Sequence, residues 1–100
     1  MMADRITALT LPKWGLSMQD GCISTWHVEE GAQVTRGDEI VDIETEKINN
    51  AFEAPASGVL RRRLAKEGDE IDVGALFGII AEADVSDDEI DRFIAEFDAP

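Results

Sequence analysis

The chain has 100 residues, of which 44% are hydrophobic and 31% charged, which suits one small domain with a modest core. Nine basic residues against 22 acidic ones give a formal net charge of −13 at pH 7, so neither a nucleic acid nor a membrane surface is an expected partner. The single cysteine, Cys22, excludes an internal disulfide and a multi-cysteine zinc site. No apolar run reaches about 18 residues and the first residues lack a signal-peptide pattern, so we expect a cytoplasmic protein.

Short stretches with strand character follow one another along the chain, separated by glycine-containing turns. We expect strands at residues 6–11, 21–28, 39–46, 48–54, 57–65 and 75–82, with brief strands around Val34 and Ile71. Many short strands with frequent turn signals are typical of a sandwich or barrel. The predicted fold class is therefore all-β.

An internal repeat relates residues 21–44 to residues 58–81. Gly21 aligns with Gly58 at an offset of 37 residues, and the same offset aligns further glycine, glutamate and apolar positions. Two copies are too few for a solenoid, and neither half is large enough to bury its apolar face alone. The repeat therefore predicts two halves related by a pseudo-twofold axis.

One of the chain's three lysines, Lys47, lies in the segment that joins the two halves. Strand patterns on both sides predict a hairpin that turns near Glu46 and Lys47. A lysine at a hairpin tip often serves only solubility. The neighbouring Glu44 and Glu46 favour a protonated amine, which argues against a Schiff-base or general-base lysine but not against a lysine that another enzyme acylates.

Several motifs of this sequence resemble those of lipoyl domains. The attachment motif of that family, E-T-D-K-A, is similar to DIETEKI at residues 42–48. The opening signature of the family resembles LPKWGLSMQDG at 11–21, and its A-P-x-x-G-x-V/I element resembles EAPASGVL at 53–60. The resemblance covers residues 5–82 and departs from the family at Glu46 and Ile48, which replace Asp and Ala. Neither departure removes the acceptor nitrogen.

The resemblance implies a flattened antiparallel barrel of two pseudo-twofold-related four-stranded sheets. It also implies that a lipoate ligase or lipoyl transferase attaches lipoate through an amide to Lys47, with Glu46 and Ile48 as flanking recognition residues. The loop at 12–20 would lie beside the lysine hairpin in this family, which makes Trp14 a candidate partner contact. Burial of Trp14 over the edge of the core is the alternative.

In lipoyl domains the modified lysine is a swinging arm that serves separate enzymes. The resemblance therefore implies as partners a thiamine-diphosphate dehydrogenase component, dihydrolipoamide dehydrogenase, and coenzyme A at an acyltransferase domain. This chain would be a monomeric, non-catalytic carrier, and its parent chain a dihydrolipoyllysine-residue acetyltransferase. The wording PKWGLSM at 12–18 resembles acetoin dehydrogenase complexes more than pyruvate or 2-oxoglutarate complexes.

Three alternatives remain from the residues. Biotinyl carrier domains share the fold, but their acceptors usually read A-M-K-M, and no Met is adjacent to Lys47. An unmodified structural barrel is the second alternative. A small enzyme is the third, but His27 has no nucleophile or paired carboxylate recognisably placed with it. For Cys22 we expect the role of a small buried hydrophobe.

Residues 83–100 differ from the carrier domain predicted for residues 1–82. They hold seven acidic residues and one basic residue. Ser86 and Glu89 form a capping box, and the apolar residues that follow repeat at helical spacing from Ile90 to Phe97. We therefore expect an acidic linker with a short amphipathic helix, which starts a missing downstream region.

The one basic run of the chain is Arg61-Arg62-Arg63. We expect it to lie on a solvated strand face and to balance nearby carboxylates. A docking patch for an acidic partner is the alternative.

Overall fold

The computed structural model describes residues 5–46 and 48–97. These residues form eight strands and one helix. The elements in chain order are β1 (Ile6–Thr10), β2 (Asp20–Trp26), β3 (Gln33–Val34), β4 (Glu39–Glu44), β5 (Asn49–Glu53), β6 (Gly58–Arg63), β7 (Glu70–Asp72), β8 (Leu76–Ala81) and α1 (Asp87–Phe97). The expected strands and the helix are all present, and the strands expected at 21–28, 39–46 and 57–65 end earlier because turns begin there.

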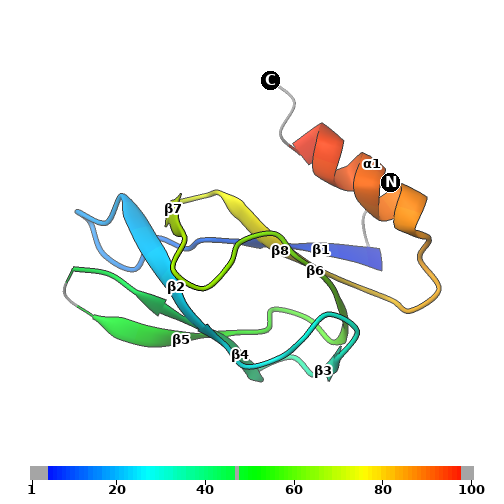
Figure 1. The fold of residues 1–100 in the computed structure, drawn as a ribbon, viewed down its shortest axis with the longest axis horizontal. Helices are drawn as coiled ribbons and strands as arrows, with labels where there is room; N and C mark the ends of the chain where they lie inside the picture. Colours follow the sequence, from blue (N-terminus) through cyan, green and yellow to red (C-terminus); the bar gives the residue numbers. More distant parts are fainter. Residues whose placement is uncertain (1–4, 47, 98–100) are drawn as a thin grey trace.

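The strands form two antiparallel four-stranded sheets that pack face to face (Figure 1). One sheet has the order β1-β8-β6-β3 and the other the order β5-β4-β2-β7. The internal repeat relates β2, β3 and β4 to β6, β7 and β8. Each of these strands therefore has the same place in its sheet as its repeat-related strand has in the other sheet. The predicted pseudo-twofold barrel is confirmed.

Matching hydrogen bonds join the two halves. The N–H of Gly31 donates to the carbonyl of Leu60, and the N–H of Gly68 donates to the carbonyl of Ile23, both at 2.7 Å. Gly31 and Gly68 have φ values of 95° and 96°, a left-handed conformation that glycine adopts at low cost. Each turn therefore needs glycine for its backbone conformation, and its N–H group forms a hydrogen bond to the other half.

The interior between the sheets is filled by apolar side chains from both repeats. Phe77 is fully buried and contacts Trp26 and Phe52, with ring centroids 5.9 and 5.2 Å apart. The other buried members of this core are Leu9, Leu11, Ile23, Val34, Ile40, Val41, Ile43, Ala54, Leu60, Ala65 and Ile80. Burial of this surface is the main source of stability for a fold of this size.

Helix α1 begins as the capping box predicts, since the Ser86 hydroxyl accepts the N–H of Glu89 at 3.1 Å. The helix packs on the outer face of the β1-β8-β6-β3 sheet (Figure 1). No helix among the described residues is long and apolar enough to cross a membrane.

The arginine run is only partly solvated. Arg61 and Arg62 form ion pairs with Asp87 of α1, at 3.1 and 3.4 Å. Arg63 lies over the Trp26 ring, 5.6 Å from its centroid, and donates to the carbonyl of Val28. The run balances nearby carboxylates as expected, and two of its carboxylate partners belong to the chain's own helix.

Candidate functional site

The hairpin between β4 and β5 carries the lysine motif. Glu44 pairs with Asn49 as the last residues of the ladder, and the N–H of Thr45 donates to the carbonyl of Ile48 at 2.7 Å. This bond closes the chain reversal between β4 and β5. Glu46 is exposed, and Lys47 lies outside the described residues. The predicted reversal of the chain near Glu46 is confirmed.

The Thr45 side chain braces the same turn. Its hydroxyl accepts the N–H of Ile48 at 3.2 Å and lies 3.3 Å from the carbonyl of Ile48, to which it donates. Together with the backbone bond, three hydrogen bonds connect Thr45 and Ile48 across the turn. The ends of the β4 and β5 strands are thereby held in a fixed register.

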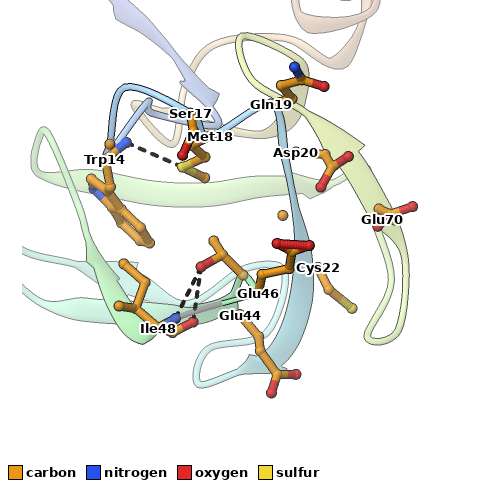
Figure 2. Close-up of a pocket in the computed structure, with 13 residues that line it drawn as sticks. Trp14, Ser17, Met18, Gln19, Asp20, Cys22, Glu44, Glu46, Ile48 and Glu70 are labelled. Atoms are coloured by element: carbon orange, nitrogen blue, oxygen red, sulfur yellow. Dashed lines mark hydrogen bonds between the residues drawn. The ribbon is translucent and has the colours of Figure 1, made fainter.

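The loop between β1 and β2 lies beside this hairpin, as the resemblance implies. It is folded on itself, because the N–H of Met18 donates to the carbonyl of Gly15 at 3.1 Å and the N–H of Trp14 donates to the Met18 sulfur at 3.2 Å. The Trp14 indole packs against the edge of the main core and points toward Ile48 of the hairpin (Figure 2). Trp14 is therefore half-buried over the edge of the core, which agrees with the alternative expectation, and its role as a partner contact stays a prediction.

An open cleft of about 650 Å³ separates the loop from the hairpin (Figure 2). Its lining residues are Trp14, Gly15, Ser17, Met18, Gln19, Asp20, Gly21, Cys22, Glu44, Thr45, Glu46, Ile48 and Glu70. Among the described lining residues four are acidic and none is basic, so these side chains contribute a negative potential to the cleft.

Two features of this region were not expected from the sequence. Leu16, at the outer end of the loop, is 99% exposed. The sequence gives no sign of this, because an apolar residue in a short motif does not indicate exposure. Cys22 is only half-buried and lines the cleft, so the prediction that it is a buried hydrophobe is wrong. Its place on β2, one residue after the buried Gly21, turns its side chain away from the core.

His27 lies outside the cleft lining and contacts Asp42, with 3.0 Å between Nε2 and Oδ1. Within residues 5–46 and 48–97 no group of three or more His, Cys, Asp and Glu side chains is placed to hold a metal ion.

The comparisons with known proteins agree with this architecture. A family model described as "Biotin-requiring enzyme" matches residues 7–80. The solution structure of the lipoyl domain of the 2-oxoglutarate dehydrogenase complex from Azotobacter vinelandii is 37% identical, with a TM-score of 0.64, and the match covers 75% of this chain and 95% of that domain. The chain belongs to the lipoyl domain family. The lipoyl-carrier assignment made from the sequence is thus confirmed.

Longer relatives of this lipoyl domain match it over α1 as well as the barrel. The dihydrolipoyllysine-residue acetyltransferase component of the acetoin cleaving system of Cupriavidus necator is 48% identical over 95% of the chain. The component of the same name from Pseudomonas putida is 45% identical over 95% of the chain. The chain spans about a quarter of the length of these curated relatives.

The residues that flank the acceptor position are compatible with a covalently attached cofactor. Glu46 and Asn49 are exposed and Ile48 is 41% exposed. The hairpin stands at the edge of the cleft. The roles of Lys47, Glu46, Ile48 and Trp14 remain predictions.

Proposed function

We propose that this domain carries lipoate as an amide on Nζ of Lys47 and serves the acetyltransferase component of an acetoin-cleaving dehydrogenase complex. The observation that carries the proposal is the match of the E-T-E-K-I motif to an exposed, braced hairpin in a lipoyl domain fold. The acetoin assignment is supported by the names of the two bacterial relatives that match 95% of the chain.

Lipoate, when attached, supplies a dithiolane that accepts an acyl group and electrons. The contribution of this chain is to present the lysine on a rigid turn and to offer a surface that partner enzymes recognise. A lysine amine is ordinarily charged at neutral pH, so a lipoate ligase or lipoyl transferase must deprotonate Lys47 in its own site. The domain is proposed to be a non-catalytic carrier.

The partners follow from this role. The enzymes that would recognise the carrier are a thiamine-diphosphate component, an acyltransferase domain that uses coenzyme A, and dihydrolipoamide dehydrogenase. Attachment removes one positive charge and changes the formal net charge from −13 to −14. A domain with this large negative charge is attracted to basic surfaces of these enzymes. The cytoplasmic location expected from the sequence remains a prediction.

Contact with the thiamine-diphosphate component is proposed to involve the loop as well as the hairpin. Leu16 and Ile48 are both exposed apolar side chains, and the cleft between their segments is acidic. A partner surface with basic groups around an apolar pocket complements this arrangement.

The decisive experiment is lipoylation in vitro. The unmodified chain is incubated with lipoate ligase, lipoate and ATP, and peptide mapping by mass spectrometry locates the product. We expect one lipoyl group, on Lys47, and none in the Lys47→Arg variant. Modification of Lys13 or Lys66, or biotinylation of Lys47 by a biotin ligase in a parallel reaction, contradicts the proposal.

A further inference from the structure

The outer faces of the two sheets differ, although the internal repeat relates the strands that form them. Glu39, Asp42 and Glu44 of β4 align with Leu76, Ile79 and Ala81 of β8 at the offset of 37 residues. The β4 residues are exposed or half-buried, whereas Ile79 and Ala81 are 0% and 3% exposed. An antiparallel sheet with one solvated face normally carries polar residues there. The β8 face therefore has the composition of a face that is covered.

The cover is α1 together with the segment that leads into it. Val85 and Ile90 are fully buried against Ile79 and Ala81. The half-buried residues of the same cluster are Ile6, Leu76, Phe93 and Ile94. This second apolar cluster is separate from the core between the sheets. It holds α1 over the β1 and β8 strands (Figure 1).

Charges at the edge of the cluster complement each other. Arg62 pairs with Asp91 at 3.3 Å as well as with Asp87, and Arg61 also donates to the backbone carbonyl of Glu82 at 2.8 Å. The aligned residues on the other sheet are Ser24 and Thr25, so the arginines occur only on the face that receives the acidic helix. Exposed ion pairs add little stability, but they select an acidic helix and its orientation.

The helix depends on this contact. It has 11 residues, with acidic residues in its first turn and no basic residue in its last turn. An isolated helix of that length is marginal in water. Its formation is therefore coupled to docking on the sheet.

We infer that the outer face of β8, with Arg61 and Arg62, is a docking site for the helix that follows it in the same chain. Docking makes residues 5–97 one rigid body, so that, where further domains follow, a tether to them begins after α1. This moves the boundary that composition places at residue 83. The inference holds whether or not Lys47 is lipoylated, so its failure is distinct from failure of the proposed function.

Docking of α1 determines where a tether leaves the domain and how far it reaches. Helix α1 and the β4–β5 hairpin lie at opposite ends of the long axis (Figure 1), which measures 39 Å. A docked helix therefore keeps the tether away from the hairpin and its cleft. If residues 83–97 were free instead, they would lengthen the tether by about 50 Å when fully extended.

The test is backbone ¹⁵N relaxation of the 100-residue chain. Docking predicts order parameters of about 0.85 for residues 87–97, as in the strands, and values below about 0.6 for Ile90→Asp. The matched control is Ala95→Asp, which adds the same charge on the exposed side of α1 and should leave the values unchanged. Low values in the unaltered chain, or equal effects of the two variants, overturn the inference.

A second pair of variants covers the case in which Ile90→Asp unfolds the barrel. Arg62→Glu opposes Asp87 and Asp91, and we expect amide hydrogen exchange of α1 to increase about tenfold while the strands keep their protection. Arg36→Glu makes the same charge change in the exposed turn between β3 and β4 and should have no effect on α1. Equal exchange in the two variants overturns the inference. A dimeric mass in sedimentation also overturns it, because the helix of a second copy would then fill the site.

Discussion

The Glu67 carboxylate of one half accepts the backbone N–H of Trp26 in the other half, at 2.9 Å. The aligned residue Glu30 accepts the N–H of Arg63 in the reverse direction, at 2.7 Å. Trp26 and Arg63 are the last residues of β2 and β6, and in each case a glutamate side chain accepts the N–H. The repeat therefore conserves a reciprocal side-chain cap as well as the strand order.

Removing either cap should destabilise the domain by a similar amount. We expect Glu67→Ala and Glu30→Ala each to lower the free energy of unfolding by about 1 kcal/mol, a loss of about 4–8 °C in Tm. Glu53→Ala, on an exposed strand end, is the control and should change little. Urea unfolding monitored by Trp fluorescence measures all three. A neutral result for one cap and a large loss for the other would contradict the reciprocal role.

The glycines of the two matching turns should be equally intolerant of side chains. An added Cβ at Gly31 or Gly68 meets no atom within 4 Å, so the cost of Gly→Ala is conformational alone, about 1–2 kcal/mol at each site. Gly15→Ala is the control, because this position is open and its φ is not positive. Asn at position 31 should recover part of the loss. Thermal unfolding of each variant checks the expectation, which fails if Gly31→Ala is as stable as Gly15→Ala.

The hydroxyl of Thr45 should matter for modification more than for stability. Thr45→Val removes the two side-chain hydrogen bonds to Ile48 and keeps the shape of the side chain. We expect the KM of lipoate ligase for the domain to rise several-fold with a small change in Tm. Thr45→Ser keeps the hydroxyl and should restore the KM. An unchanged KM in Thr45→Val would show that the backbone bond alone holds the turn.

Variants at Leu16 and Trp14 distinguish an effect on partner recognition from an effect on folding. Because Leu16 is 99% exposed, Leu16→Ala should leave Tm unchanged and lower kcat/KM for reductive acylation by the thiamine-diphosphate component. Trp14→Ala should lower both, because the indole packs against the core. If the folded fraction of Trp14→Ala is acylated at the normal rate, Trp14 is not a partner contact.

The acidic cleft should make acylation sensitive to salt. Association steered by charge slows as ionic strength rises, so the rate should fall several-fold between low salt and about 0.5 M salt. Neutralising Glu46 and Glu70 with Gln should reduce this dependence. Neutralising Asp88 and Glu96, on α1 at the other end of the domain, is the control with the same change in charge. A rate that is independent of salt would exclude steering.

Much of this architecture follows from local patterns. Glycine at aligned turn positions, apolar residues at a period of two and a capping box before Ile90 specify the strands, the pseudo-twofold relation and the helix. These signals act over a few residues, because backbone conformations and hydrogen bonds within turns are local. The E-T-E-K-I motif between the two halves likewise pointed to the lysine hairpin.

Other features depend on contacts between residues that are distant in sequence. Only the fold shows that Leu16 is exposed and that Cys22 faces the cleft. The arginine run illustrates the same limit, because Arg61 and Arg62 meet Asp87 only after α1 has docked on β8. Periodicity reports which residues share a face, but the identity of what covers that face is set by tertiary packing.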